Sequence, residues 1–279
     1  MTKTPYALLI PAILLAQEAP APPAQPHWMI SLGAVRHLRR ADPSGTLDRR
    51  FFSDPAGFVM NGLHGAFGFP PGWRALPAAT FPSYAAMAKA LQGSQVPAEV
   101  KAIIYDNESR TFTPPGEQHD LERFEKLAAE AIHRAGRIFI ATPAADLVPV
   151  LSPNVERGKR YDEYLRLGIP RMAARWADVY EVQAQGSEDN LPLYTRFVKA
   201  AAAEARVANP KVRVFAGLST NPSGKRVTAK QLYDAVEATR GAVDGYWLNI
   251  PGGGAYCPKC GEPQPQVAVD LLRMLDGLI

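Results

Sequence analysis

Residues 100–141, VKAIIYDNESRTFTPPGEQHDLERFEKLAAEAIHRAGRIFIA, contain one complete strand–helix–strand unit. Val100–Tyr105 and Arg137–Ala141 are short apolar runs typical of buried strands. Between them, apolar side chains recur three and four positions apart from Leu121 to Ile132, and Gly136 follows where the predicted helix ends. Two strands joined through a helix must run parallel. This stretch therefore predicts a parallel α/β sheet.

The same unit repeats towards the C-terminus. Apolar runs predict strands at Asp178–Val182, Val212–Ala216 and Asp244–Leu248. Helical periodicity alternates with them and predicts four more helices, at Tyr161–Trp176, Leu193–Ala208, Thr228–Arg240 and Gln266–Leu275. Thr228 is a suitable N-cap for the third of these helices.

The first hundred residues are less regular. Met29–Val35 and Gly57–Asn61 are predicted as strands, and a helix is expected near Ser83–Leu91. Residues 62–82, rich in Gly, Pro and aromatic side chains, are predicted as a long loop. This makes seven strands, or eight if Tyr6–Leu15 is also a strand. The predicted fold is a (β/α)8 barrel (TIM barrel) formed by one domain over residues 27–279. An open doubly wound sheet is the alternative, but no Gly-rich phosphate-binding turn follows any strand to favour it.

Residues 1–26 have two interpretations. One Lys precedes an apolar stretch and then an Ala/Pro-rich segment, which resembles a secretory signal and linker and predicts a secreted or envelope protein. The alternative is a cytoplasmic protein in which Tyr6–Leu15 forms the first strand. The apolar stretch is too short to span a bilayer, and no integral membrane association is expected.

Composition indicates a globular protein whose partner is not nucleic acid. The 279 residues are 47% hydrophobic and 21% charged, and the net charge of +4 is spread along the chain. The densest basic stretch, LRRADPSGTLDRR at residues 38–50, has no interleaved aromatic residues and is predicted to be a solvated loop.

Polar side chains spaced two apart end three of the predicted strands. They are Asp106 and Glu108 in AIIYDNE, Glu181, Gln183 and Gln185 in VYEVQAQ, and Trp247 and Asn249 in GYWLNI. Residues two apart on a strand share one face, and barrel enzymes place their sites at the C-terminal ends of the strands. By the same argument Asn61, His64 and Asn221 are expected at this site.

These residue types are suited to binding a carbohydrate and to acid/base catalysis on it. Carboxylates can supply a proton donor with a raised pKa and an ionised partner, whereas amides and Trp247 suit hydroxyl recognition and stacking. Glu108 is predicted to be the acid/base, and Glu181, from another strand, the nucleophile or general base. The predicted activity is hydrolysis of a glycosidic bond in a polysaccharide or oligosaccharide.

AIIYDNE also resembles the fourth-strand motif of the family 18 glycoside hydrolases, the chitinase-like barrels, whose signature ends in Asp-x-Glu. The resemblance implies that Glu108 is the proton donor and that Asp106 orients the N-acetyl group of the substrate. It also implies that Trp247 forms the floor of the site. The chain departs from the family pattern at Ile104, where an upstream acid is expected, and at residues 183–185, where a Tyr-Asp pair is expected.

The remaining motifs predict structure rather than further chemistry. Cys257 and Cys260 are the only cysteines, and a local disulfide is expected if the protein is exported. No second Cys or His pair completes a zinc site, so neither a metal nor a cofactor is predicted. Two alternatives to a hydrolase stay open: a barrel that binds glycans without cleaving them, and a lyase or isomerase that uses the same carboxylates on a small molecule.

Overall fold

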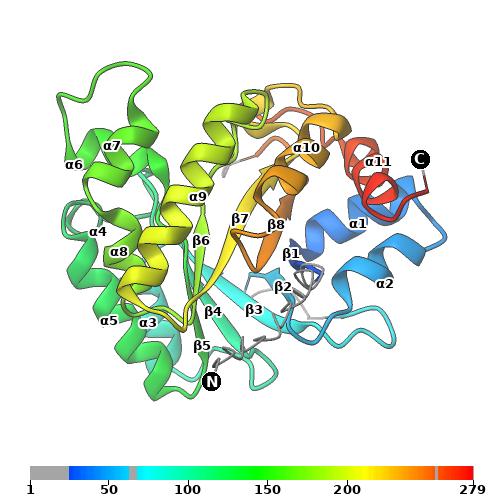
Figure 1. The fold of residues 1–279 in the computed structure, drawn as a ribbon. Coiled ribbons are helices and arrows are strands. Elements are labelled where there is room, and N and C mark those ends of the chain that lie inside the picture. Colours follow the sequence, from blue (N-terminus) through cyan, green and yellow to red (C-terminus); the bar gives the residue numbers. More distant parts are fainter. Residues whose placement is uncertain (1–24, 63–67, 255–256, 279) are drawn as a thin grey trace, which may run out of the picture.

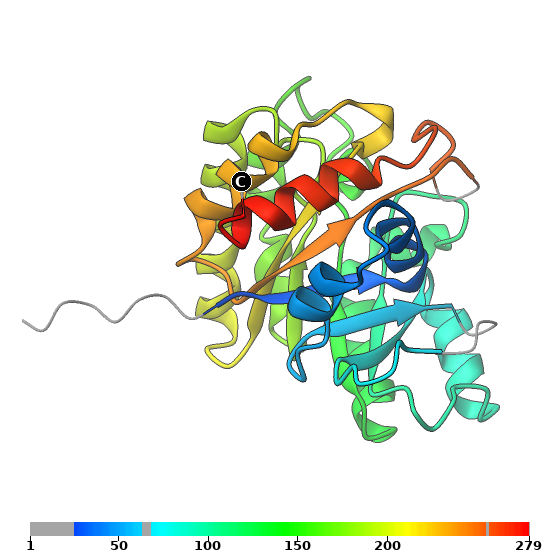
Figure 2. The ribbon, with the colours of Figure 1, turned by 90° about the vertical axis from the view of Figure 1, so that its right-hand side faces the viewer.

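The computed structural model describes residues 25–62, 68–254 and 257–278 of the chain. Eight parallel strands form a closed barrel in which each strand pairs with the next and β1 pairs with β8 (Figures 1 and 2). The strands are β1 (His27–Ser31), β2 (Phe58–Asn61), β3 (Leu76–Phe81), β4 (Ala102–Tyr105), β5 (Ile138–Ala141), β6 (Val179–Val182), β7 (Arg213–Ser219) and β8 (Gly245–Asn249). The predicted (β/α)8 barrel is confirmed.

Helices surround the barrel and pack on one another in a nearly complete ring, which runs from α3 through α5, α8, α9, α10 and α11 to α1. Shorter helices lie in the loops. The helices are α1 (Leu32–Ala41), α2 (Thr46–Phe52), α3 (Tyr84–Gln92), α4 (Pro115–His119), α5 (Leu121–Arg134), α6 (Val148–Leu151), α7 (Arg160–Arg166), α8 (Ile169–Ala174), α9 (Leu191–Ala208), α10 (Ala229–Thr239) and α11 (Pro265–Leu275), with 3-10 turns η1 (Ala145–Leu147) and η2 (Pro222–Gly224). Within the described residues, no helix has the length and apolar character needed to cross a membrane.

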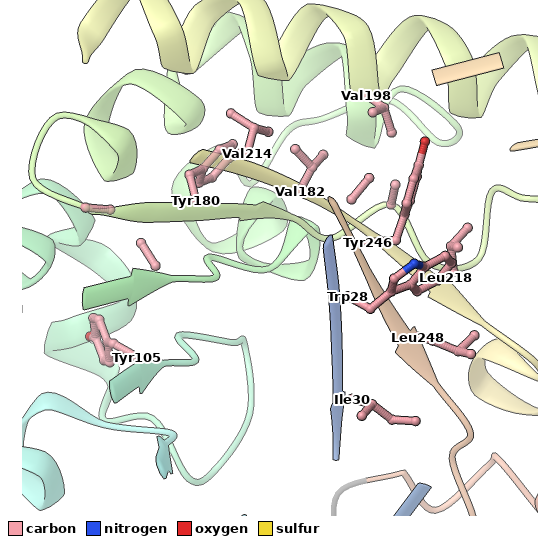
Figure 3. Close-up of a cluster of buried hydrophobic side chains, with 14 of the residues drawn as sticks. Trp28, Ile30, Tyr105, Tyr180, Val182, Val198, Val214, Leu218, Tyr246 and Leu248 are labelled. Carbon is pink, nitrogen blue, oxygen red and sulfur yellow. The ribbon is translucent and has the colours of Figure 1, made fainter. Parts of the chain in front are cut away.

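Alternation along each strand divides the core into two layers. Inward side chains such as Met29, Phe58 and Phe215 fill the barrel, as expected for this fold. Outward side chains of the strands, among them Tyr105 and Tyr180, pack against the helices (Figure 3). Both layers are almost completely excluded from solvent, so the barrel is a solid support for the loops at its ends.

The eighth strand is not where the sequence suggested. It is β3, inside the stretch predicted as a long loop, whereas Tyr6–Leu15 lies outside the described residues. This strand was not predicted because it contains Pro77, and a proline inside an apolar run argues against a strand. The carbonyl of Pro77 still accepts a hydrogen bond from Lys101 N (2.8 Å), and β3 pairs in register with both β2 and β4.

Two predictions near the N-terminus were wrong. The strand predicted over Met29–Val35 ends at Ser31, whose hydroxyl caps α1 by accepting a hydrogen bond from Ala34 N (3.1 Å). Residues 38–50 are not a loop but the end of α1, a turn and most of α2. An ion pair between Arg39 and the buried Asp48 joins the two helices, whereas Arg40, Arg49 and Arg50 are exposed to solvent.

The helix predicted over Tyr161–Trp176 is divided in two. Gly168, at a φ of +69°, separates α7 from α8, and Pro170 occupies the first turn of α8. A left-handed residue followed by a proline stops one helix and starts another in a new direction. The capping prediction at Thr228 is confirmed: its side chain and that of Gln231 form a capping box at the start of α10.

Candidate active site

The C-terminal ends of the strands surround two adjoining cavities. The first, of about 260 Å³, is lined by residues that follow β4 to β8. The second, of about 400 Å³, is lined mainly by the ends of β1 to β4. Both include Asp106, Glu108, Arg110 and Trp247, so these four residues form the wall and floor between the two cavities.

The backbone after β4 places both acids of the Asp-x-Glu motif in the cavities. Asn107, between them, points the other way: its amide donates to the Tyr105 hydroxyl (3.0 Å) and to Glu117 O (3.1 Å) in the outer core. Asn107 is fully buried there. Strand-like alternation thus continues past the end of β4 and places Asp106 and Glu108 on the same side.

Asp106 is held by two neighbouring strands. The hydroxyl of Thr142, after β5, donates to Asp106 Oδ1 (2.9 Å), and the amide of Gln183, after β6, donates to the same oxygen (3.0 Å). Gln183 also donates to Thr142 O (2.8 Å), which fixes the amide in this orientation. Burial raises the pKa of Asp106 to about 6, and the hydrogen bond from Thr142 opposes that rise.

Glu108 has the environment of a proton donor. Burial raises the pKa of Glu108 to about 9, and the nearby Asp106 contributes to the rise, while Arg110 opposes it. Nε of Arg110 lies 2.9 Å from Oε2 of Glu108. At neutral pH a carboxyl group with such a pKa carries a proton, and its place between the two cavities makes that proton accessible to a ligand in either.

Glu181 occupies a different position from the other two acids. Its side chain is fully buried and lines neither cavity; its Oε1 accepts a hydrogen bond from Gln185 Nε2 (3.3 Å), and Gln185 does line the first cavity. The amide of Gln185 lies over Gly217 of β7, where a Cβ atom would come within 2.2 Å of it. Burial raises the pKa of Glu181 well above its ordinary value.

The other predicted ligand-binding residues divide between the two cavities. Trp247, 8% exposed, borders both, and no hydrogen-bond partner for its Nε1 lies in the described residues. Asn249 lines the first cavity and Asn61 the second. His64 falls outside the described residues.

Asn221 supports the site from outside it. It is buried and lines neither cavity; its amide donates to Pro251 O (3.1 Å), Cys260 O (3.0 Å) and Glu262 O (3.3 Å). These bonds attach the loop after β8 to the end of β7. Cys257 and Cys260 lie in that loop with their Cα atoms 5.4 Å apart, and both line the first cavity.

Sequence reasoning missed several residues that the fold brings to the first cavity. Asp146, in the turn η1 after β5, lines it, and its Oδ1 accepts a hydrogen bond from Ser109 N (2.9 Å), directly beside Glu108. Arg160 and Tyr161, at the start of α7, line it as well. Arg110 was also missed, and among these residues it is the one that a sequence pattern could have identified, because it continues the two-residue spacing of Asp106 and Glu108.

The first cavity thus contains three carboxyl groups, two guanidinium groups and several amides and hydroxyls above an aromatic floor. Among the described residues, no group of three or more His, Cys, Asp or Glu side chains is arranged to hold a metal ion. The site can donate a proton, stabilise positive charge with carboxylates and hydrogen-bond a polar ligand.

The sequence matches no protein-family model and none of the curated proteins. The structure is similar to a family 18 chitinase from Pseudoalteromonas aurantia, with a TM-score of 0.52 and 10% sequence identity over 91% of this chain and 100% of that chain. Further matches include a triosephosphate isomerase from Bartonella henselae (TM-score 0.45, 15% identity, 90% of this chain and 98% of that chain). A psychrophilic family 10 endo-β-1,4-xylanase also matches (TM-score 0.45, 11% identity, 88% and 96%). At these identities the likeness shows the fold alone: a barrel of the kind that glycoside hydrolases use.

Proposed function

We propose that the chain is a glycoside hydrolase that cleaves a glycosidic bond in a polysaccharide or oligosaccharide, with Glu108 as the proton donor. The observation that carries this proposal is the position of Glu108. Its carboxyl group has a pKa of about 9, lies on the wall shared by two cavities, and has two further carboxyl groups, those of Asp106 and Asp146, close to it.

In this proposal the three acids have separate roles. Glu108 donates its proton to the glycosidic oxygen as the bond to the leaving sugar breaks; a water molecule then adds to the anomeric carbon and returns a proton to the Glu108 carboxylate. Negative charge on Asp106 and Asp146 stabilises the positive charge that develops on the sugar ring, and hydrogen bonds from Thr142 and Gln183 hold Asp106 in place. The second carboxylate that sequence reasoning assigned to Glu181 is here supplied by Asp106 and Asp146, because these two line the cavity and Glu181 does not.

The shape of the site supports an extended substrate. Cavities on both sides of Glu108 give room for sugars before and after the bond to be cleaved. Trp247, between the two cavities, can stack on a sugar face, while Asn249, Gln185 and Asn61 can hydrogen-bond hydroxyl groups.

The loop that carries Cys257 and Cys260 borders the same site. We propose that the two cysteines form a disulfide, which would hold this wall of the first cavity in place, and that the protein is exported to a compartment in which such a bond persists. Thiol alkylation of the protein, as isolated from its native host, tests the disulfide: labelling only after reduction is expected.

One observation favours a second candidate, a barrel that binds glycans without cleaving them. The contact between Arg110 and Glu108 engages one oxygen of the proposed acid. If that contact persists when a glycan is bound, Arg110 favours the ionised form of Glu108, which has no proton to give to the glycosidic oxygen. The two functions differ in turnover, not in binding.

The decisive experiment measures hydrolysis and binding together. Wild type, Glu108→Gln and Asp146→Asn would be assayed on chitin, peptidoglycan, and α- and β-glucan oligomers, with Glu99→Gln, an exposed acid on the loop before β4, as the matched control. We expect turnover in wild type and in the control, and a loss of at least about a hundredfold in Glu108→Gln with binding retained. Binding without turnover in all four proteins would establish the second candidate, and neither binding nor turnover would overturn both.

A further inference from the structure

A third hollow, of about 390 Å³, lies beside the first cavity, and cations dominate its lining. Arg157, Lys159 and Arg196 line it together with a single carboxylate, Asp162. It is formed by the loop between α6 and α7, which projects from the molecule, and by the start of α9 (Figure 1). We call these three cations, together with Arg160, the cationic rim.

The charges of the cationic rim are only partly neutralised within the protein. The single carboxylate of Asp162 pairs with two of these cations: its Oδ1 lies 2.8 Å from Arg196 Nη2, and its Oδ2 lies 3.9 Å from Lys159 Nζ. Arg157 and Arg160 are exposed, and neither forms an ion pair with any residue in the described part of the chain. The rim therefore presents more positive charge than its own carboxylate can balance.

The cationic rim is continuous with the proposed active site. Arg160 itself lines the first cavity, and its neighbour Lys159 lines the third hollow. Tyr161 fixes this junction: its ring packs on Phe197 of α9, with the ring centroids 4.5 Å apart, and its hydroxyl lies 3.5 Å from Gln185 O beside the first cavity. A chain that leaves the first cavity on this side would pass directly over the guanidinium groups.

We propose that the substrate is an anionic glycan, whose carboxylate or sulfate groups bind the cationic rim while its backbone occupies the cavities beside Glu108. This inference rests on the proposed function and names its substrate class. Guanidinium groups bind planar carboxylates and sulfates through paired hydrogen bonds, and neutral sugars offer them no charge to neutralise. The second cavity, with Phe112 and Trp247 in its lining, has no such excess of cations, so the charged part of the ligand lies on the α7 side.

The test measures binding by titration calorimetry in the Glu108→Gln background, so that the ligand survives the measurement. The ligands are hexamers: an oligogalacturonate, a sulfated heparan-type oligomer, maltohexaose, chitohexaose and a six-nucleotide RNA. The variant Arg157→Gln/Arg160→Gln is compared with Arg134→Gln/Lys211→Gln, which removes two exposed cations at the opposite end of the barrel. Hydrolysis of the four glycans by the wild type is followed in parallel.

We expect a carboxylated or sulfated hexamer to bind at least tenfold more tightly than either neutral hexamer. Comparing the affinity for the oligogalacturonate with that for the sulfated oligomer shows which anionic group the rim binds. The rim variant should weaken that binding by about twofold to tenfold, as expected for two exposed charge contacts, whereas the control variant leaves it unchanged. Equal losses in both variants, or equal affinity for neutral and anionic hexamers, would overturn the inference. So would a preference for RNA. If the protein hydrolyses a neutral glycan and shows no preference for the anionic ones, the anionic-substrate inference is refuted and the proposed function stands. If it neither binds nor hydrolyses any glycan, both the inference and the proposed function are refuted.

Discussion

Glu108 and Asp106 show how two acids in one motif can acquire different chemistry. Both are placed on the same side by strand alternation. Asp106 accepts two hydrogen bonds at one oxygen, whereas the carboxyl group of Glu108 contacts only Arg110 among the described interactions. Burial raises the pKa of both, to about 6 for Asp106 and about 9 for Glu108. Between these values one acid is ionised and the other is protonated, which is the division that acid catalysis at an acetal requires.

This division predicts a bell-shaped dependence of kcat/KM on pH. Activity rises as pH increases through about 6, where Asp106 loses its proton, and falls above about 9, where Glu108 loses the proton that it must donate. Because Arg110 lowers the pKa of Glu108, Arg110→Met should move the alkaline limb to higher pH. Rate measurements between pH 4 and 11 check this; an alkaline limb unmoved by Arg110→Met would show that another group controls it.

A single glycine is expected to control one wall of the first cavity. In Gly217→Ala the new methyl group would displace the Gln185 amide, which also loses its hydrogen bond to Glu181. Glycan binding should weaken by about threefold to tenfold, the cost of about one hydrogen bond. Titration of the variant against Gly241→Ala, where no atom lies within 4 Å of the new Cβ, isolates the effect; equal affinity in the two variants would contradict it.

At the scale of elements, the helices do more than cover the barrel. The start of α7 supplies Arg160 and Tyr161 to the first cavity, and the turn η1 supplies Asp146. Helix α5 contributes an unexplained feature: Glu125 is fully buried against the outer face of the barrel, and neither carboxylate oxygen has a hydrogen-bond partner within the described residues. Burial raises the pKa of Glu125 well above its ordinary value.

Replacing Glu125 should therefore stabilise the protein in a pH-dependent way. Above the ordinary carboxyl pKa the unfolded chain releases this proton, whereas the folded protein retains it, so folding is disfavoured increasingly as pH rises. Glu125→Leu removes that cost and should raise the free energy of unfolding by about 1–3 kcal/mol at pH 8, with a smaller gain at pH 4. Urea unfolding at both pH values measures it, and a gain that is the same at pH 4 and pH 8 would refute the titration argument.

At the scale of the whole molecule, closure of the barrel joins segments that are far apart in the chain. Arg213, at the start of β7, donates to Ala56 O just before β2 (3.0 Å), across 157 positions of sequence. Its guanidinium group also lies over Phe58, at 5.1 Å from the ring centroid, and over Phe215, at 6.0 Å. Arg213 thus closes the end of the barrel opposite the candidate site.

Arg213→Met should destabilise the entire barrel, because it keeps the apolar stem but removes the hydrogen bond and the cation–π contacts. We expect a loss of about 1–3 kcal/mol in the free energy of unfolding, with no change in glycan binding. Denaturant unfolding followed by tryptophan fluorescence and by circular dichroism should give one shared transition for both probes. Arg134→Met, which removes an exposed charge, is the control; equal effects of the two substitutions would show that Arg213 has no role in closure.

The sequence by itself determined the features that depend on local geometry. Repeated strand–helix units require parallel strands, and a strand places Asp106 and Glu108 on one side wherever it lies. The parallel sheet and the acid pair were therefore predictable from residues 100–141, and the repetition of the unit along the chain predicted the barrel. The Thr228 cap was predictable for the same reason, because a capping box involves only residues three apart.

Only the tertiary structure decided what depends on register and on contacts between distant loops. Pro77 argues against a strand locally, yet β3 forms because β2 and β4 lie on both sides of it and complete the barrel. Glu181 and Gln185 share a face of their strand, but the depth of each in the barrel depends on the neighbouring strand and on Gly217. Asp146 in η1 and Arg160 at the start of α7 reach the first cavity from two parts of the long connection between β5 and β6, and no short-range pattern records how these parts meet in space.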